Sequence, residues 1–360
     1  MRALVDAREL ANAVAHAVRV LEKDDPGVSL SADGERVAVT AAGDSQWSRS
    51  TLDAEILEPG DVVVNGLWLA SLAQAMPSGE ISVETDGPNL QLRGGQATLR
   101  MRLASEELRP ENPAMPDSFT DVDPAEYEAL CRSVVNAAGA TRDRPVLAAV
   151  RFRGADGVLE AAATNRFMAG RRSMDAAVPD GEWLADADWV KRNARSITSI
   201  GFTGRHMVVR TAYDTDMIAL VDGQYPRIDG FWWDTAEATG SIGVDRKALT
   251  EAARMLKSVC FDTSSSTVPL ILDEHDGLLR VSYAGTGRDS DSAGVRALEA
   301  EISGEARMKV NADYLLAALG AMDADTVVIR KREGSDGRVG PYLIGQEDGR
   351  VDQLIMPVRG

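Results

Sequence analysis

The sequence contains few cysteines and few aromatic residues, and it has no long apolar run. Two of its 360 residues are cysteine, 5% are aromatic and 44% are hydrophobic. Cys131 and Cys260 stand far apart in apolar, helix-like patterns, so we expect two buried free thiols in a reducing cytoplasm rather than a disulfide. No stretch reaches the roughly 20 apolar residues of a membrane-spanning helix, and the first residues show no signal peptide. We therefore predict a cytoplasmic protein, without membrane contact, whose cores consist mainly of Ala, Val, Leu and Ile.

Motifs for catalysis and for metal binding are also absent. The three histidines, His16, His206 and His275, do not pair at metal-ligand spacing, and there is no Cys-x-x-Cys. No glycine-rich run ends in Lys-Ser or Lys-Thr, and Gly285-Thr286-Gly287 lacks the following helix that a dinucleotide site needs. No Gly-x-Ser-x-Gly elbow occurs. We therefore predict a protein that is not an enzyme and has no cofactor and no metal site, so that binding or scaffolding is the favoured function.

The balance of charge is strongly acidic. There are 39 Lys and Arg against 56 Asp and Glu, which gives a formal net charge of −17. Because phosphate binding needs positive side chains, this sum alone argues against nucleic acid. An acidic surface also has a simpler role, which is to keep a protein soluble. The positions of the basic residues therefore carry more information than their number.

Three segments of the chain repeat the same pattern of helix starts. Each opens with an aspartate at a helix N-cap followed by apolar residues at helical spacing, and the segments lie about 120 residues apart, the size of a small domain. A second helix begins later in each segment, with Asn or Asp at the cap and an aromatic residue three positions on. The first caps are Asp6, Asp123 and Asp245, and the second caps are Asn65, Asp186 and Asn311.

The stretches between these helices alternate apolar and polar residues as strands do. Short strands bounded by Gly and Asp turns indicate antiparallel hairpins. We predict an α+β fold of three repeated domains, each with two helices packed on antiparallel sheets of about eight strands. Prolines at 110, 113 and 116 and the loop after Asp234 mark the boundaries, so the domains are residues 1–117, 118–236 and 237–360.

Most of the helices carry Lys or Arg on one face. Lys247, Arg254 and Lys257 are spaced so that they share a face. The helices at 65–76 and 311–322 have neither Lys nor Arg. A solvated helix face is the simpler interpretation, and sequence-independent contact with DNA phosphates is the alternative. The residues proposed to face DNA are Arg19, Lys23, Arg132, Lys191, Arg195, Lys247, Arg254 and Lys257.

The end of the chain is unusually apolar. Residues 354–360 read Leu-Ile-Met-Pro-Val-Arg-Gly, whereas chain termini are usually polar and frayed. Two interpretations remain open at this point. The tail is either a buried edge strand or a surface that another molecule docks onto.

Local motifs carry a resemblance to a known family along essentially the whole chain. In the order and spacing in which they occur, they resemble motifs of the bacterial DNA polymerase III beta subunits, which are the sliding clamps of replication. The motifs are Arg144-Pro145-Val146-Leu147, Ala163-Thr164-Asn165-Arg166-Phe167, Gly223-Gln224-Tyr225-Pro226, Val310-Asn311-Ala312-Asp313-Tyr314-Leu315 and Met356-Pro357-Val358-Arg359.

The resemblance implies a ring of six domains made by two chains, with the sheets outside and the helices inside. Double-stranded DNA passes through the ring without regard to sequence. A clamp loader opens and closes the ring, and the replicative DNA polymerase is tethered to it for processive synthesis. Such a ring reconciles the net charge with DNA binding, because an acidic outside repels DNA while a basic lining guides it.

The resemblance also implies a pocket for short peptides of partner proteins between the second and third domains. Carried over by motif, its walls are Arg144, Leu147, Thr164, Met168, Ala169, Leu354, Met356, Pro357, Val358 and Arg359. The family's Arg-Leu pair falls on Met168-Ala169, its Asp falls on Asn165, and the pair Trp232-Trp233 follows the Tyr-Pro motif. These departures predict an altered peptide preference, and the tryptophans either fill or reshape the pocket.

Two alternatives to a replicative clamp remain. One is an accessory, resistance or phage-type clamp that keeps the ring and changes its partners. The other is a protein that forms no ring and sequesters clamp-binding peptides.

Overall fold

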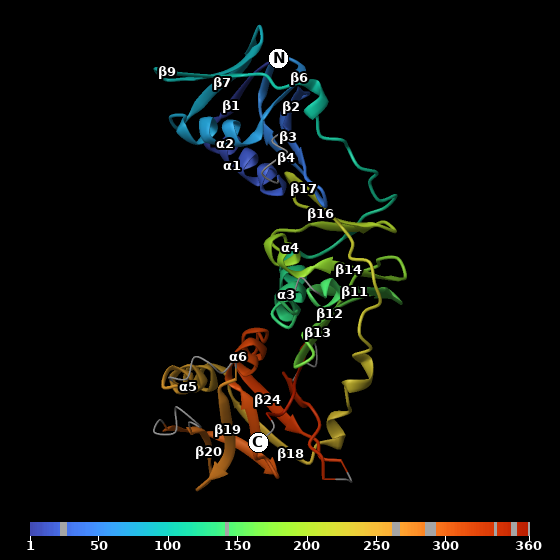
Figure 1. Ribbon diagram of the computed structural model, residues 1–360, viewed down its shortest axis with the longest axis vertical. Helices are drawn as coiled ribbons and strands as arrows, with labels where there is room; N and C mark the ends of the chain where they lie inside the picture. Colours follow the sequence, from blue (N-terminus) through green and yellow to red (C-terminus); the bar gives the residue numbers. More distant parts are fainter. Residues whose placement is uncertain are drawn as a thin grey trace. The chain divides into compact units, whose positions relative to one another are not determined.

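A computed structural model describes residues 1–21, 27–140, 144–260, 267–284, 293–334, 337–346 and 351–358. The chain divides into two compact units (Figure 1). The first comprises Met1–Pro124 and Ser196–Leu220, and the second comprises Ala125–Arg195 and Val221–Gly360. No helix within the described ranges is long and apolar enough to span a membrane.

The first unit contains two α-helices and two antiparallel sheets. The helices are α1 (Ala7–Ala17) and α2 (Gly66–Ala75), with short 3-10 helices η1 (Val18–Val20) and η2 (Glu106–Leu108). The strands are β1 (Arg2–Asp6), β2 (Gly27–Asp33), β3 (Arg36–Ala42), β4 (Gln46–Asp53), β5 (Glu55–Glu58), β6 (Gly60–Asn65), β7 (Glu80–Asp86), β8 (Asn89–Gly94), β9 (Ala97–Arg102), β10 (Thr120–Asp121), β15 (Ser199–Phe202), β16 (His206–Arg210) and β17 (Asp214–Ala219).

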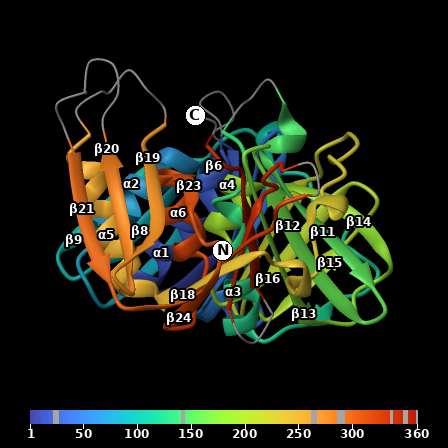
Figure 2. The ribbon, with the colours of Figure 1, turned by 90° about the horizontal axis from the view of Figure 1, so that it is seen from below.

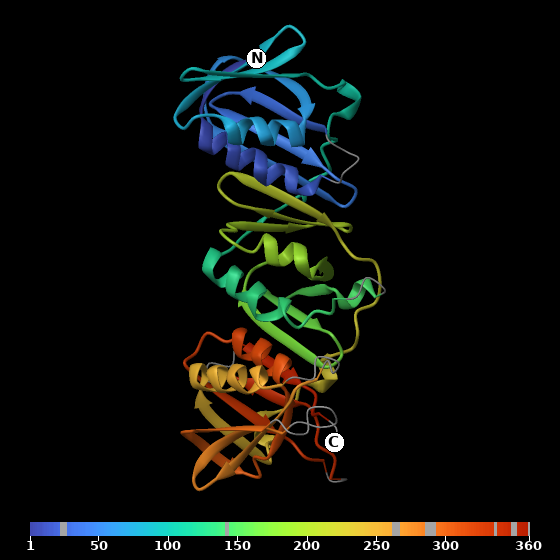
Figure 3. The same ribbon diagram turned by 60° about the vertical axis from the view of Figure 1, so that its left-hand side comes forward.

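These strands form a five-stranded sheet in the order β5-β1-β7-β8-β9 and an eight-stranded sheet in the order β10-β15-β16-β17-β4-β3-β2-β6. Figure 3 shows α1 and α2, in blue, side by side against the strands. Leu10 and Val14 of α1 and Leu69 of α2 are fully buried. They pack into a core dominated by Ala, Val and Leu, as the composition predicts.

The second unit contains the remaining helices and strands. The helices are α3 (Pro124–Val135), α4 (Ala187–Arg192), α5 (Arg246–Ser258) and α6 (Ala312–Gly320), with η3 (Pro145–Leu147), η4 (Asp229–Phe231) and η5 (Thr235–Glu237). The strands are β11 (Ala149–Ala155), β12 (Val158–Thr164), β13 (Met168–Asp175), β14 (Gly181–Asp186), β18 (Gly240–Asp245), β19 (Pro269–His275), β20 (Leu278–Ala284), β21 (Ala293–Leu298), β22 (Ala300–Gly304), β23 (Met308–Asn311), β24 (Thr326–Lys331), β25 (Tyr342–Gly345) and β26 (Val351–Ile355).

Nine strands make one sheet in the order β14-β11-β12-β13-β26-β25-β24-β18-β22, and four make a second in the order β21-β20-β19-β23. Figure 2 shows β21, β20 and β19 side by side, with α5 next to them. The first two residues of the apolar tail, Leu354 and Ile355, belong to β26, which lies between β13 and β25, so the interpretation of the tail as an edge strand is wrong. Both residues are buried there, which explains why they are apolar.

The internal repeat is visible in the order of elements. After β1, β10 and β18 comes a helix, then four or five strands, a second helix and three more strands. Five of the six predicted N-cap side chains accept hydrogen bonds from backbone N–H groups of the first helical turn, at 2.7–3.1 Å. They are Asp6, Asn65, Asp186, Asp245 and Asn311. Asp123 directly precedes Pro124, the first residue of α3. The α+β fold class is confirmed.

A two-residue turn closes the hairpin that follows the first helix in each repeat. The turn residues are Asp-Gly at 156–157 in β11–β12 and at 276–277 in β19–β20, whereas in β2–β3 they are Gly34-Glu35, because Asp33 is the last residue of β2 and pairs with Arg36. Gly34, Gly157 and Gly277 have φ of 63°, 79° and 78°, a left-handed conformation that glycine adopts without strain.

The middle repeat contributes strands to both units. Its β17 pairs with β4 of the first repeat, and its β13 pairs with β26 of the third. The eight-stranded sheet therefore contains strands of the first and second repeats, and the nine-stranded sheet contains strands of the second and third. For this reason the chain divides into two units although it contains three repeats. Residues 117 and 236, the predicted domain boundaries, lie outside the strands.

The two cysteines are free thiols, as predicted, but they differ in burial. Cys131 is buried on α3, whereas Cys260 is half-buried, so the expectation of two buried thiols is wrong for Cys260. The reason is that Cys260 lies beyond the last residue of α5. Burial raises the pKa of the Cys131 thiol to about 12, which leaves it protonated and unreactive at neutral pH.

Candidate functional site

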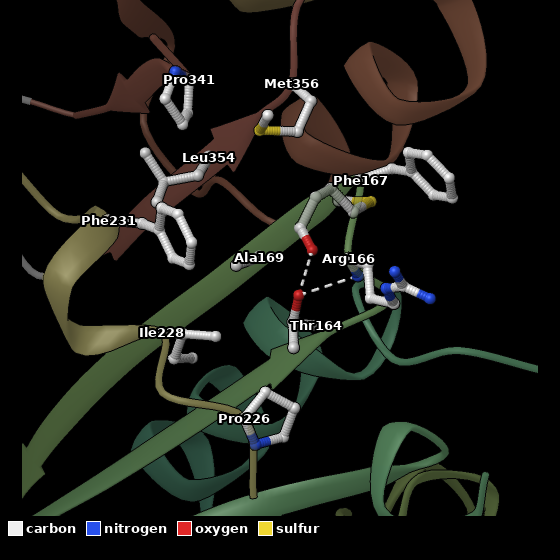
Figure 4. A pocket seen from close by; sticks show the side chains of 11 residues that line it. Thr164, Arg166, Phe167, Ala169, Pro226, Ile228, Phe231, Pro341, Leu354 and Met356 are labelled. Carbon is white, nitrogen blue, oxygen red and sulfur yellow. Dashed lines mark hydrogen bonds between the residues drawn. The ribbon is translucent and has the colours of Figure 1, made fainter.

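An apolar cavity of about 270 Å³ lies in the second unit, where β13 meets β26 (Figure 4). Four segments build it: the β12–β13 turn with the start of β13, the segment between β17 and β18, the residue before β25, and β26 with the residue after it. The residues that line it are Thr164, Arg166, Phe167, Met168, Ala169, Pro226, Ile228, Phe231, Pro341, Leu354 and Met356.

Strand pairing fixes one wall of this cavity. Ala169 of β13 lies opposite Leu354 of β26, so the two side chains point to the same face of the sheet. Trp233 packs against both, together with Leu343, and its indole N–H donates to the Pro341 carbonyl at 3.2 Å. The wall is therefore supported by a buried aromatic side chain.

The pair Trp232-Trp233 does not fill the cavity. Neither residue lines it, and Trp233 is 7% exposed behind Ala169 and Leu354. The Arg171 guanidinium lies over the Trp232 ring, 4.3 Å from its centroid. The aromatic residues that line the cavity are Phe167 and Phe231, and Phe231 is 53% exposed. The tryptophans therefore do not fill the cavity, and the interpretation that they reshape it stays a prediction.

The turn between β12 and β13 forms the opposite edge. The Thr164 hydroxyl donates to the Met168 carbonyl at 2.8 Å and accepts from the Arg166 N–H at 3.1 Å. The Asn165 side-chain oxygen accepts from the N–H groups of Phe167 and Met168, both at 2.9 Å. Asn165, which stands where the family has Asp, therefore still caps this turn. Figure 4 shows Arg166 and Phe167 projecting from it at the rim.

A buried arginine anchors the segment that carries Ile228 and Phe231. Arg151 of β11 is 4% exposed, and its guanidinium donates to both carboxylate oxygens of Asp229, at 2.9 and 3.3 Å. It also donates to Glu160 at 2.9 Å. The hydrogen bond from Arg151 is the main reason that the pKa of Asp229 lies below its usual value. This bidentate pair fixes η4 against the sheet.

The structure brings five of the ten predicted pocket residues together around the cavity: Thr164, Met168, Ala169, Leu354 and Met356. Arg144 is exposed and Leu147 is buried in η3, and neither lines the cavity. Pro357 and Val358 follow Met356 without lining it, and Val358 N–H donates instead to the Lys309 carbonyl at 2.9 Å. Arg359 lies outside the described residues.

Six lining residues were not predicted: Arg166, Phe167, Pro226, Ile228, Phe231 and Pro341. Arg166, Phe167 and Pro226 belong to motifs that carry the family resemblance, so their neighbourhood in the sequence was a usable signal. Ile228, Phe231 and Pro341 reach the cavity through contacts with residues far away in the chain, and no local pattern marks them.

Among the predicted DNA-facing residues that the structure describes, Arg19 lies on η1, Arg195 lies after α4, and the other five lie on α3, α4 and α5. Four of these residues are paired with carboxylates. Arg132 pairs with Asp323 and Lys257 with Asp313. Arg195 lies 3.4 Å from Glu128, and Lys247 lies 3.6 Å from Asp325. Each pair weakens the positive potential of the surface around it.

The other predicted basic residues differ in their surroundings. Arg19 donates to the carbonyl of His16 at 3.1 Å. Lys191 and Arg254 are exposed on α4 and α5. Lys23 lies outside the described residues. Arg254 is the predicted α5 residue for which no ion pair is seen within the described ranges, so it is the strongest candidate on α5 for a phosphate contact.

Comparison with known proteins supports the motif-based resemblance. No family model matches the chain. A beta sliding clamp of Streptomyces coelicolor is 24% identical over 391 residues, which covers 100% of this chain and 99% of that protein. The beta sliding clamp homolog GriR of Streptomyces muensis is 23% identical over 350 residues, with 92% and 91% covered.

The fold comparison agrees with the sequence comparison. The beta subunit of a Streptococcus pyogenes DNA polymerase superposes with a TM-score of 0.89 at 15% identity, covering 100% of both chains. The order of helices and strands in the three repeats is thus that of a known architecture. The predicted resemblance is confirmed: the chain is a divergent relative of the bacterial beta sliding clamps and has their fold along its whole length.

Proposed function

We propose that this protein is a DNA sliding clamp, which encircles duplex DNA and tethers a replicative polymerase and other partners for processive synthesis. The observation that carries the proposal is the match to beta sliding clamps over the full length in both sequence and fold. The helices carry exposed basic residues such as Arg132, Lys191 and Arg254 in a chain whose net charge is −17, which is compatible with the proposal, although strands such as β3 and β9 carry exposed arginines as well.

In this proposal the ring consists of two copies of the chain, each contributing three domains with boundaries near residues 117 and 236. The chain performs no chemistry itself, and a separate ATP-driven loader opens the ring. DNA is retained because the ring is closed around it, so tight binding to any one sequence is unnecessary. The protein acts in the cytoplasm, where chromosomal DNA is found.

We further propose that the cavity between β13 and β26 receives short peptide segments of the polymerase, the loader and other partners. Its lining is apolar, largely pre-formed and supported by Trp233, which suits the burial of an apolar anchor side chain. Met168 and Met356 add flexible walls that adapt to different anchors.

Retention on circular DNA tests the proposal. The purified chain is loaded onto nicked circular plasmid with a clamp loader, and bound protein is followed by gel filtration before and after the plasmid is linearised. A clamp dimer stays on the circle and is lost from the linear form. A chain that has the mass of a monomer and is never retained would refute the ring and favour the peptide-sequestering alternative.

An accessory clamp with altered partners is the second candidate. The cavity favours it through Met168-Ala169, which replace the family's charged and larger pair. Replacement of the host's replicative clamp gene by this one separates the two candidates. Growth supported by this chain alone indicates a replicative clamp, and failure despite normal loading indicates an accessory one.

A further inference from the structure

The cavity between β13 and β26 has a counterpart in the first unit. A second cavity, of about 220 Å³, lies where β4 meets β17. It is lined by the β3–β4 turn with its flanking residues, the segment 111–113 that leads to β10, and residues of β16 and β17. In the second unit, the β12–β13 turn and the segment that leads to β18 have the same places in the next repeat.

The register of the strands shows that the two cavities are equivalent. Trp47 of β4 lies opposite Met217 of β17, as Ala169 of β13 lies opposite Leu354 of β26. In both places the N–H two residues beyond this pair donates to a carbonyl of the neighbouring turn, at 2.8 Å. The donors and acceptors are Ala219 with Ser45 and Met356 with Phe167. The internal repeat therefore provides two cavities of one design.

The β4–β17 cavity differs from the other in its charge. Asp44 and Glu111 line it and are exposed, and neither forms an ion pair within the part of the chain that the structure describes. Arg109, which is close to Glu111 in the sequence, pairs elsewhere, with two other carboxylates. The third ionisable lining residue is His206, and even with a protonated His206 the lining keeps a net negative charge. The cavity therefore attracts a cation.

An apolar surface lies beside these carboxylates. Trp47 occupies the place that Ala169 has in the other cavity, is 5% exposed and packs against Met217. Its indole N–H is buried and has no acceptor among the residues described, whereas the N–H of Trp233 donates to a carbonyl. Because buried polar groups of native proteins are nearly always hydrogen-bonded, an unpaired donor marks a place that an acceptor from outside can complete.

We propose that the β4–β17 cavity is a second binding site, and that its ligand is a basic side chain, Lys or Arg, of a partner polypeptide. The aliphatic stem packs against Trp47 and Met217, and the cation pairs with Asp44 and Glu111. A polypeptide also carries backbone carbonyls, which are the acceptors that Trp47 lacks, and a free cation carries none. The choice of a polypeptide ligand rests on the proposed function of the β13–β26 cavity, whereas the equivalent position and the charge do not.

NMR spectra of the full-length chain test this inference through the methyl group of Met217 and the indole N–H of Trp47. The probes are N-acetyl-arginine-N-methylamide, its neutral isostere N-acetyl-citrulline-N-methylamide, and butylguanidinium, which has the cation but no carbonyl. The arginine probe should shift both signals in a saturable way. It should bind about two- to fivefold more tightly than either of the other probes, and its advantage over citrulline should shrink at high salt.

Four variants complete the design. Asp44→Asn and Glu111→Gln should each lower the affinity for the arginine probe about two- to fivefold and leave that for the citrulline probe unchanged. Glu58→Gln makes the same change of charge at an exposed residue of β5 and should alter neither affinity. Trp47→Phe keeps an aromatic ring and removes the N–H, so the arginine probe, followed through Met217, should lose its advantage over butylguanidinium. A thermal unfolding scan checks that each variant is folded.

Each outcome decides one part of the inference. Equal affinity for the arginine and citrulline probes overturns recognition of a cation, as does a loss in Glu58→Gln as large as that in Asp44→Asn. Butylguanidinium that binds as tightly as the arginine probe overturns the polypeptide ligand in favour of a free cation. If no probe shifts the Met217 signal, the second site is refuted. The β13–β26 cavity is judged separately, by deletion of residues 356–360, so failure of one site can be told from failure of the other.

Discussion

Individual charged residues shape the cavity by fixing backbone segments. Arg151 is nearly inaccessible to solvent, yet its guanidinium reaches Asp229 on the segment that brings Ile228 and Phe231 to the cavity. Removing the carboxylate of such a pair leaves the buried guanidinium without its opposite charge. Asp229 therefore affects the cavity although it does not line it.

The Asp229 pair predicts a pH dependence of stability. The hydrogen bond from Arg151 lowers the pKa of Asp229 in the folded chain, so the folded state holds this proton less tightly than the unfolded state does. The stabilisation is complete above the ordinary pKa of aspartate and disappears as the pH falls through the lower, folded-state pKa. Asp229→Asn should cost about 1 kcal/mol at pH 7, and this difference should vanish in acid. Urea unfolding between pH 2.5 and 7 measures it.

Asp273→Asn is the matched control for this prediction. Asp273 pairs with Arg280 in the β19–β20 hairpin at 2.7 Å, and hydrogen bonding by Arg280 likewise lowers its pKa. Both variants should therefore be less stable than the native protein at pH 7, and both differences should disappear as the pH falls. Only Asp229→Asn should also weaken peptide binding, because Asp273 holds no segment of the cavity. Equal peptide affinities for the two variants would contradict the positioning role of Asp229.

At the scale of elements, the last strand and the residues that follow it have separate roles. β26 lies inside the nine-stranded sheet and stabilises the fold, whereas Met356 leaves the strand and lines the cavity. The sequence suggested a choice between a buried strand and a docking surface. The structure shows a buried strand that ends at Ile355 and lies inside the sheet, and Met356 lines the cavity that we propose as a docking site.

This division predicts the effect of a truncation. Deletion of residues 356–360 removes one wall of the cavity but leaves β26 complete, so peptide binding should fall at least tenfold while the urea midpoint barely changes. Leu354→Ala is the contrasting variant, because it removes a buried side chain from the strand and should cost about 2–5 kcal/mol. Fluorescence polarisation and urea unfolding of both variants measure the two effects. Unchanged peptide affinity after the truncation would remove Met356 from the site.

The elements were predictable to the extent that local chemistry sets them. An Asp or Asn cap satisfies N–H groups within its own helix turn, so Asp6 or Asn65 can be recognised from a few neighbouring residues. The pairing of Ala169 with Leu354 joins residues far apart in the chain, and motif resemblance alone pointed to it. Phe231 depends on the anchoring of η4 by Arg151, which neither local pattern nor motif indicated.

At the scale of the whole molecule, the distribution of charge matters more than its sum. The chain has a net charge of −17. Several Lys and Arg side chains on the helices form ion pairs with carboxylates of the same unit. Lys257 of α5 pairs with Asp313 of α6, while Arg254 on α5 is exposed. The paired cations contribute little to phosphate binding until their carboxylates are displaced. A weakly basic helix face of this kind suits a ring that slides, because no phosphate register is held tightly.

The proposed DNA contacts therefore predict opposite effects for two single substitutions. Arg254→Ala should weaken binding to a short duplex and reduce the slope of log K against log salt by about 0.9, the value for one phosphate contact. Asp313→Asn frees Lys257 and should strengthen binding and steepen the slope by a similar amount. Fluorescence anisotropy of a labelled 30-base-pair duplex between 25 and 200 mM salt measures both. Glu301→Gln changes the net charge as Asp313→Asn does, but on an exposed residue of β22. If Glu301→Gln raised the affinity and slope as much as Asp313→Asn, the net charge alone would govern DNA binding, and the helix faces would have no special role.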